Sequence, residues 1–459
     1  MRDLTQGSIT AHLIGMAAFI GLGLIFQTLY FIVDLYFVSR LGNAAIAGVS
    51  AAGNVFFLAL AATQMISIGV MSTVAQAVGR KDEAEANLMS DQAISMSLAG
   101  AVLMLVFGYA FGGAGVDLMT ADAATAAEGR AYLYAFIPAL ALMFPTNAMV
   151  SALRGAGVTM QTMVLQTATV LLNAVLAPVL IAGAGTGVAL GAAGAGWAST
   201  IASLVGTIGL VLMFPRVQKY LRLHVRTLAP KFDAWKRIIF IGLPTSLEFL
   251  LMFVIFVVIY WVIRDFGAEA QAGFGIGGRI MQSIFLPAMA IAFAAAPIAG
   301  QNFGAKRYDR VRETFKQTAL IGSAIMLTLS LLCHVAPELM ARPFTNDPAV
   351  LAITVEYLQI VSWNFVFSGL VMAAGSLFQG IGDTRPSLLA SATRTFTFVA
   401  PAIWLAYQPW HKLEYVWYLS VASVVCQCAL AMWLLLKTFK RKLPSPALAE
   451  TPAAAACQG

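Results

Sequence analysis

Charged residues are scarce in this sequence. Asp, Glu, Lys and Arg together make up 11% of its 459 residues, whereas about 25% is usual in a soluble domain. A soluble fold of this length needs a charged surface that the chain cannot supply. The composition therefore excludes soluble enzymes, soluble nucleic-acid-binding proteins and disordered scaffolds, and it indicates a membrane protein.

Clusters of cysteine and histidine are also missing. The four Cys and four His are scattered along the chain without the spacing of a metal site. We expect no disulfide framework, no metal centre and no cofactor. A membrane-embedded enzyme is disfavoured, because it needs clustered His, Asp or Cys inside its spans. The first apolar stretch, from Leu13 to about Val38, is too long for a signal peptide and is interpreted as a membrane span.

What the sequence does have is a series of long apolar runs. Hydrophobic residues make up 60% of the chain, and its mean hydropathy is +0.82. One membrane crossing needs about 20 apolar residues. The runs predict an all-α polytopic protein with twelve membrane helices. These lie near 13–38, 46–75, 90–113, 130–152, 161–183, 190–214, 238–263, 271–299, 315–336, 351–377, 387–407 and 414–436.

The positions of Lys and Arg predict the orientation. With the N-terminus placed inside, 21 of the 28 Lys and Arg fall in inner segments, five fall in outer segments, and Arg279 and Arg394 fall within spans. Such a bias is the usual signature of cytoplasmic loops. We therefore expect a multi-pass protein of the cell (inner or plasma) membrane with both termini in the cytoplasm. Its basic pI follows from this topology and requires no nucleic-acid partner.

The second half of the chain repeats the first at one constant offset. LGNAAIAG at 41–48 aligns with FGAEAQAG at 266–273, and QAVGRK at 76–81 aligns with QNFGAK at 301–306. RGAGVT at 154–159 aligns with QGIGDT at 379–384, without a gap. Each repeat holds an even number of predicted spans, so both repeats have the same orientation and are related by a pseudo-two-fold axis along the membrane normal.

This repeat defines the predicted domains. We expect an N-terminal six-helix bundle at 1–214, a basic cytoplasmic linker at 215–237, a C-terminal six-helix bundle at 238–436 and a disordered cytoplasmic tail at 437–459. Two bundles around a central cavity are typical of a transporter that works by alternating access. A channel is disfavoured because the spans contain no rings of charge.

The motifs together resemble the multidrug and toxic compound extrusion (MATE) family over about residues 10–436. They are Leu41-Gly42 with Ala47-Gly48, Gln76-x-x-Gly79, Gln301-x-x-Gly304, Arg154-Gly155-x-Gly157, Gly380-x-Gly382-Asp383-Thr384 and Gly242-Leu243-Pro244. The chain is more similar to the DNA-damage-inducible F (DinF) branch than to the norfloxacin-resistance branch. The latter carries a Glu on helix 7 where Met252 stands here.

The resemblance implies a secondary antiporter, in which amphipathic organic compounds, mostly cations, leave the cell as H⁺ or Na⁺ enters. We expect small-molecule substrates, a lipid bilayer around the protein, and a monomer. The alternative is a lipid or lipid-linked oligosaccharide flippase of the same superfamily. Flippases often have additional spans or a basic cavity, and twelve spans with few intramembrane arginines disfavour that alternative.

Only two acidic residues lie well within the predicted spans, Asp34 and Glu248. A carboxylate at the bilayer centre costs about 2.5–3.5 kcal/mol on insertion scales, so it calls for a function or a polar environment. Asp34 matches the family's coupling Asp on helix 1, where protonation or Na⁺ binding would drive transport. The alternative is an interfacial Asp that reaches the outer surface near Arg40.

The second expected carboxylate of the ion site is absent. The DinF branch usually carries Asn-x-x-x-Asp-Pro on helix 5, and this chain has Asn173 and Pro178 but Ala177 in place of the Asp. Asn173, carbonyls freed near Pro178 and Asp34 are the predicted ion-coupling groups, with Na⁺ near Asp34 as one possibility. Four residues could complete the site or make ordinary hydrogen bonds between helices. They are Tyr132, Asn147, Ser199 and Thr200.

Charged residues of the second repeat complete the set of candidates. Glu248 lies four residues after Pro244 and could line the cavity or pair with a cytoplasmic Arg. Arg279 and Arg394, the basic residues inside spans, could contact an anionic substrate, and Arg394 could instead reach toward the inner surface. Arg279 is therefore the stronger candidate of the two for the cavity.

Overall fold

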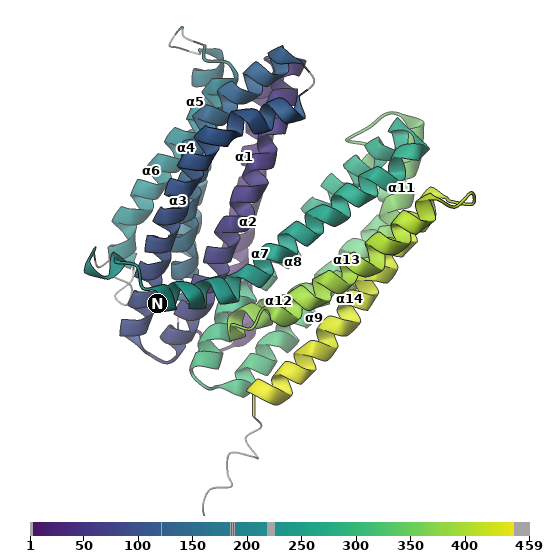
Figure 1. The fold of residues 1–459 in the computed structure, drawn as a ribbon. Helices are drawn as coiled ribbons and strands as arrows, with labels where there is room; N and C mark the ends of the chain where they lie inside the picture. The colour runs from purple at the N-terminus through teal and green to yellow at the C-terminus, as the bar shows by residue number, and fades with distance from the viewer. Residues whose placement is uncertain are drawn as a thin grey trace, which may run out of the picture. The chain divides into compact units, whose positions relative to one another are not determined.

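The structure is a computed structural model of the protein, and Figure 1 shows its helices as a ribbon. It describes residues 3–120, 122–183, 185, 187, 189–217 and 225–444, with side chains for all of these except 30–35, 43, 54, 215–217, 225 and 226. The regular structure of the described residues is entirely helical. The all-α prediction is therefore confirmed.

The chain divides into two compact units. Unit 1 is built mainly from Gly15–Ser246, and unit 2 from Leu4–Ile14 and Leu247–Gly459. The division falls inside two long helices, α1 (Ile9–Ser39) and α7 (Phe232–Ile263). Helix α1 begins in unit 2 and continues in unit 1, and α7 begins in unit 1 and continues in unit 2. Each unit thus contains the beginning of a helix that continues into the other.

The other helices follow in chain order. Unit 1 contains α2 (Asn43–Gly79), α3 (Glu83–Met119), α4 (Ala123–Gly155), α5 (Met160–Ala182), α6 (Ala192–Val217) and the 3₁₀ helix η1 (Val225–Leu228). Unit 2 contains η2 (Arg264–Phe266), α8 (Ala268–Gly304), α9 (Tyr308–Val335), α10 (Pro337–Ala341), α11 (Pro348–Val361), η3 (Ser362–Asn364), α12 (Phe365–Ile381), α13 (Arg385–Ala406) and α14 (Leu413–Lys442).

Within the described residues, twelve helical segments are long and apolar enough to cross a membrane, which confirms the predicted number of spans. Most extend beyond the predicted ranges, because their amphipathic ends continue past the apolar run. Of the predicted tail, α14 includes residues up to Lys442, and 445–459 lie outside the described residues. Many large apolar side chains are exposed, as expected for a surface that faces lipid.

The tenth predicted span is interrupted in its middle. Helices α11 and α12 are separated by the 3₁₀ turn at Ser362–Asn364. The hydroxyl of Ser330 on α9 donates to the carbonyl oxygen of Ser362 at 2.9 Å, and Nδ1 of His334 lies 3.2 Å from the Ser362 hydroxyl. Polar side chains of a neighbouring helix thus accompany the break, which the hydropathy of the run does not indicate.

The backbone repeats at the same offset as the sequence. Helix α2 begins at Asn43 and α8 at Ala268, and both are 37 residues long. Lys81 and Lys306 have left-handed φ values of 60° and 58°, although neither is a glycine. Non-glycine residues seldom adopt this conformation, so its recurrence at equivalent positions indicates that each loop requires it.

The RGAG and QGIG motifs have the same structural cause. A Cβ at Gly155 would lie 2.7 Å from the carbonyl oxygen of Met71, and one at Gly380 would lie 2.5 Å from the carbonyl oxygen of Ala296. Met71 and Ala296 are equivalent positions of the two repeats, as the two glycines are. Two residues further on, Gly157 and Gly382 are left-handed, with φ of 81° and 78°. The glycines therefore permit a close helix approach and then a turn.

Helices α2 and α7 also approach closely within unit 1. A Cβ at Gly69 would lie 2.3 Å from the carbonyl oxygen of Ile238, and one at Gly242 would lie 1.8 Å from that of Met65. Both distances are far shorter than a carbon–oxygen contact of about 3.3–3.6 Å. Gly242 of the Gly-Leu-Pro motif is therefore required by backbone packing.

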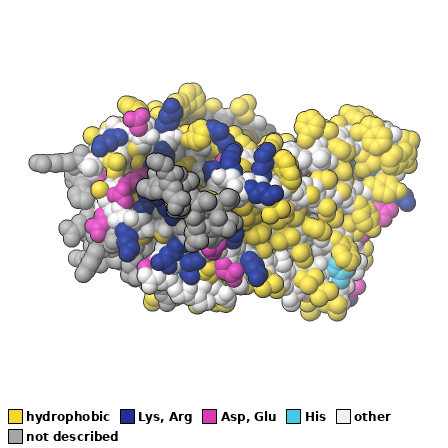
Figure 2. Space-filling view, turned by 90° about the horizontal axis from the view of Figure 1, so that it is seen from below, with side chains coloured by type: hydrophobic (Ala, Val, Ile, Leu, Met, Phe, Trp, Pro, Cys, Tyr) yellow, Lys and Arg dark blue, Asp and Glu magenta, His cyan; other side chains and the backbone are white. Residues whose placement is uncertain are grey.

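Basic side chains gather at one end of each unit. Arg80 and Lys81 lie in the α2–α3 connection, and Lys306 and Arg307 lie in the α8–α9 connection. Figure 2 shows one face of the molecule on which Lys and Arg side chains are concentrated among hydrophobic ones. We call the end of each unit that carries these connections its basic end.

Candidate functional site

The interior of unit 1 brings together four of the predicted site residues from α4, α5 and α6. Asn173 has no exposed surface, and its Nδ2 atom lies 3.4 Å from the Ser199 hydroxyl. The Thr200 hydroxyl donates to the carbonyl oxygen of Ala135 at 2.6 Å. Tyr132, one turn before Ala135, is buried and packs in the same apolar cluster as Ala177. The polar groups therefore lie among the apolar residues of this cluster.

The amide oxygen of Asn173 is the unsatisfied group of this site. Oδ1 is buried and has no hydrogen-bond partner among the described residues. Leaving a buried acceptor unpaired costs about 1–3 kcal/mol, so such an atom calls for water or a cation. Pro178 has no N–H, which removes the helical donor for the carbonyl oxygen one turn earlier. Within one turn of α5 there are thus an amide oxygen that no described group pairs with and a carbonyl oxygen without its helical donor.

The structure does not place two further predicted members in this site. Asp34 lies on α1, but its side chain is outside the described residues. Asn147 is half-buried on α4, fifteen residues from Tyr132, which corresponds to about 22 Å along a helix. The structure therefore does not place Asn147 with Tyr132, and the role of Asp34 stays a prediction.

Glu248 of α7 belongs to a second polar site, in unit 2. The hydroxyls of Ser387 and Ser391 on α13 lie beside its carboxylate. The carboxylate atom Oε1 is buried and has no partner among the described residues. Nε2 of Gln427 on α14 donates to the Ser391 hydroxyl at 3.2 Å. The partners of Glu248 are thus hydroxyls, and the predicted alternative of a cytoplasmic Arg partner is not what these contacts show.

Little in the sequence indicates these partners. Ser387 and Ser391 are four residues apart, so they share one face of α13. Serines in apolar helices are common, however, and nothing in the sequence relates them to a Glu on another helix. The structure of the first repeat offers a parallel. Gly23 is equivalent to Glu248, and a Cβ there would lie 3.4 Å from Oε1 of Gln166, which is equivalent to Ser391. In both units, a polar side chain of the equivalent helix faces this position.

The two arginines within spans lie in different surroundings. Arg279 on α8 is exposed. Arg394 follows Ser391 by three residues on α13, and its Nε is buried without a partner among the described residues. Arg394 also lies near Tyr357 on α11, whose ring lies 4.9 Å from that of Trp417. Within the described residues, no group of three or more His, Cys, Asp and Glu could hold a metal ion.

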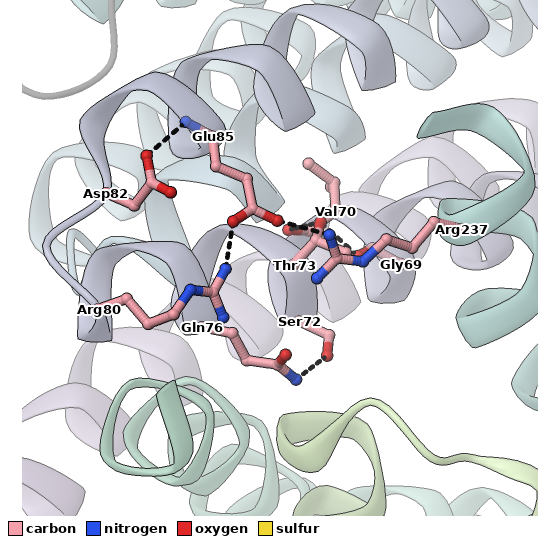
Figure 3. Close-up of polar contacts among 9 residues, drawn as sticks. All are labelled: Gly69, Val70, Ser72, Thr73, Gln76, Arg80, Asp82, Glu85 and Arg237. Atoms are coloured by element: carbon pink, nitrogen blue, oxygen red, sulfur yellow. Dashed lines mark hydrogen bonds and ion pairs between the residues drawn. The ribbon is translucent and has the colours of Figure 1, made fainter. Parts of the chain in front are cut away.

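A charged network fixes the start of α7 at the basic end of unit 1, and Figure 3 shows it in close-up. Glu85 on α3 accepts hydrogen bonds from Arg80 of the α2–α3 connection and, at 2.5 Å, from Arg237 on α7. Gln92 of α3 donates to the carbonyl oxygen of Ala229 at 2.8 Å and accepts from the backbone N–H of Lys231 at 2.7 Å. These contacts hold the residues on both sides of the helix start.

Comparisons with known proteins agree with this architecture. The model of the MatE family matches residues 20–179 and 244–405, one segment in each repeat. Multidrug export protein MepA of Staphylococcus haemolyticus is 22% identical over 409 residues and aligns over 88% of each chain. Probable multidrug resistance protein NorM of Thermotoga maritima is 24% identical over 388 residues, which is 84% of this chain and 81% of the relative.

Two solved structures share the fold. One is a multidrug resistance MATE family transporter of the MOP superfamily in an outward-facing conformation, with a TM-score of 0.89 and 22% identity. The other is a MOP superfamily transporter from Pyrococcus furiosus, described as having a binding pocket of reverse polarity that suggests a different function; it has a TM-score of 0.89 and 21% identity. Both cover 96% of this chain and 98% of their own. Assignment to the DinF branch stays a prediction.

Proposed function

The chain belongs to the MatE family of membrane transporters, and from this premise we propose that it exports amphipathic organic compounds, mostly cations, in exchange for H⁺ or Na⁺. The relatives named as multidrug export and multidrug resistance proteins align over most of their length, which supports drug-like substrates. Alternating access, coupling without a cofactor, a monomeric state and cytoplasmic termini are parts of the same proposal.

The observation that carries the coupling proposal is the buried Oδ1 of Asn173, which has no hydrogen-bond partner among the described residues. An uncharged amide cannot titrate, so H⁺ coupling at this site has to use the Asp34 carboxylate on α1. Na⁺ coupling, by contrast, can use the Asn173 oxygen directly as a ligand together with that carboxylate. The remaining candidate cavity residues act on substrate or ion in this proposal. They are Tyr132, Asn147, Ser199, Thr200, Glu248 and Arg279.

The experiment compares an imposed pH gradient with an imposed Na⁺ gradient in proteoliposomes that contain the purified protein and a fluorescent organic cation. One gradient should drive uphill movement of the dye, and the other should not. Asp34→Asn should abolish this movement without loss of protein in the membrane. Full transport by the Asn variant would remove Asp34 from the coupling mechanism, and dye movement with neither gradient would reject antiport.

A flippase for lipids or lipid-linked oligosaccharides is the second candidate. If the chain were such a flippase, Arg279 and Arg394 are the basic side chains within spans that would bind the phosphate of a lipid headgroup. The same proteoliposomes distinguish the two functions if they carry a headgroup-labelled lipid and are assayed without the dye. Protein-dependent movement of the lipid, together with no dye transport, would replace the drug-export proposal.

A further inference from the structure

The segment that precedes α1 is held inside unit 2. Leu4 is completely buried and Thr5 is 8% exposed. The chain then turns into α1: Gly7 adopts a left-handed φ of 73°, and the Ser8 hydroxyl accepts a hydrogen bond from the N–H of Ala11 at 3.4 Å. A hydroxyl at this position satisfies a free donor of the first helical turn. The segment is therefore an ordered lead into the helix.

Side chains from the end of α8 and the start of α9 bind the main chain of this segment. The carbonyl oxygen of Leu4 accepts from Nδ2 of Asn302 at 3.1 Å and from a guanidinium N–H of Arg310 at 3.4 Å. The Leu4 N–H donates to Oε1 of Gln301 at 3.4 Å. The carbonyl oxygen of Thr5 accepts from Arg307 at 2.6 Å. We call these four side chains the N-terminal clasp: Gln301, Asn302, Arg307 and Arg310.

Contacts within the clasp also position its side chains. Nε of Arg310 donates to Oδ1 of Asn302 at 2.9 Å, and Nδ2 of the same Asn also donates to the carbonyl oxygen of Ile298 at 2.8 Å. Two of the four side chains therefore fix one another. The four contacts given above are made to backbone groups of the segment, so the clasp binds the main chain, and the Leu4 side chain is buried.

The repeat supplies a second, independent observation. Arg310 of the clasp is equivalent to Glu85, which binds Arg237 near the start of α7 in unit 1 (Figure 3). One repeat position therefore fixes the beginning of a helix that passes between the units in each case. The chemistry differs, because Arg310 binds a carbonyl oxygen and Glu85 binds a guanidinium. The role is the same.

Helix α1 links the clasp to the predicted ion-coupling residue. It is continuous from Ile9 to Ser39, and it passes from unit 2 into unit 1 after Ile14. We propose that the N-terminal clasp binds the segment of Leu4 and Thr5 throughout the transport cycle and thereby keeps the beginning of α1 on unit 2. Any movement of α1 that follows a change at Asp34 then takes place with the first turn of the helix held in position. This role in transport rests on the proposed antiport.

The binding itself is tested by labelling, without any transport. Thr5→Cys, in a background whose four cysteines are replaced by alanine, keeps the backbone carbonyl that Arg307 binds. A polar maleimide should label this Cys slowly in the purified full-length protein. Adding Arg307→Ala should raise the rate about tenfold, since a hydrogen bond from a charged group is lost. The matched control is Arg312→Ala, because Arg312 binds Asp309 and the carbonyl oxygen of Leu443 instead. Equal rates in all three proteins would overturn the clasp.

The role in transport is tested by covalent replacement of one contact. Arg307→Ala should lower dye transport, and Arg312→Ala should not. Thr5→Cys combined with Arg307→Cys should be as impaired as Arg307→Ala, and a short thiol cross-linker should restore transport to the level of the control. The proposal that the clasp binds the segment throughout the cycle would be overturned by either of two results. One is that the cross-link does not restore transport, and the other is normal transport by Arg307→Ala. If unaltered protein and control both fail to carry the dye, the proposed function fails, while the labelling rates still decide whether the clasp exists.

Discussion

The close approach of α7 to α2 predicts opposite effects on stability when two glycines are replaced by alanine, Gly242 and Gly53. At Gly242 an added methyl group would lie 1.8 Å from the carbonyl oxygen of Met65 and 2.6 Å from its carbonyl carbon. The helices would have to separate by about 1.5 Å to reach an ordinary carbon–oxygen distance. At Gly53, which lies on α2, no atom of the described residues lies within 4 Å of the added methyl group.

The loss of stability caused by alanine at Gly242 also includes a hydrogen bond between the two helices. One turn further on, the Ser246 hydroxyl donates to the carbonyl oxygen of Ala61 at 2.8 Å, and a separation of that size breaks this bond. Overpacking costs about 1–3 kcal/mol, and the lost hydrogen bond adds about 0.5–1.5 kcal/mol. Gly53→Ala should instead stabilise the protein by about 0.4–1 kcal/mol, because alanine has fewer unfolded conformations.

The assay measures the thermal stability of the purified full-length protein in detergent, as the fraction that remains monodisperse after heating. Gly242→Ala should lower the midpoint and Gly53→Ala should leave it unchanged or raise it. A midpoint for Gly242→Ala equal to or above that of the unaltered protein would refute the packing argument. Equal losses for both variants would show that the general effect of alanine in these helices, and not the contact with Met65, determines the result.

Three further predictions concern ionisable groups. Ala177→Asp places a second carboxylate one turn from Asn173 and should shift the pH dependence of transport; an unchanged profile would mean that the missing acid has no bearing on coupling. Glu248→Gln keeps the shape of the side chain but removes its charge, so it should lower dye transport more than Ser391→Ala does. Equal dye transport by the two variants would assign Glu248 a packing role only. Burial lowers the pKa of His411, in the α13–α14 connection, below its usual 6.5. Below pH 6.5 the unfolded chain therefore binds the proton more readily, so stability should fall there, and the fall should be smaller in His411→Asn when thermal midpoints are compared.

Helix positions were predictable because a span in lipid requires a long apolar run. The repeat was predictable because glycines recur at equivalent turns of the two halves. Gly157 and Gly382 illustrate this, since the motif marks a turn that both repeats need. The reason for Gly155 was not predictable, because it depends on a carbonyl oxygen of another helix. The sequence indicates that a residue is small, and only the fold identifies the group that it avoids.

The polar sites were predictable as single residues and not as sites. Asn173 and Glu248 were identified because a polar side chain in an apolar run is costly. Their partners could not be identified, because Ser391 is remote from Glu248 in the sequence and resembles any other helical serine. The break at Ser362–Asn364 was missed for the same reason: it contains neither Pro nor Gly, and side chains from α9 accompany it.

The clasp sets an order for biosynthesis. Leu4 leaves the ribosome long before the side chains that bind its main chain, because these lie at positions 301 to 310. The segment of Leu4 and Thr5 therefore stays without these contacts while unit 1 and the first helices of unit 2 are synthesised. Helix α1 can enter the membrane early, but its beginning reaches its final place only after α9 has started. The last contact of the first helix is thus made late in assembly of the second unit.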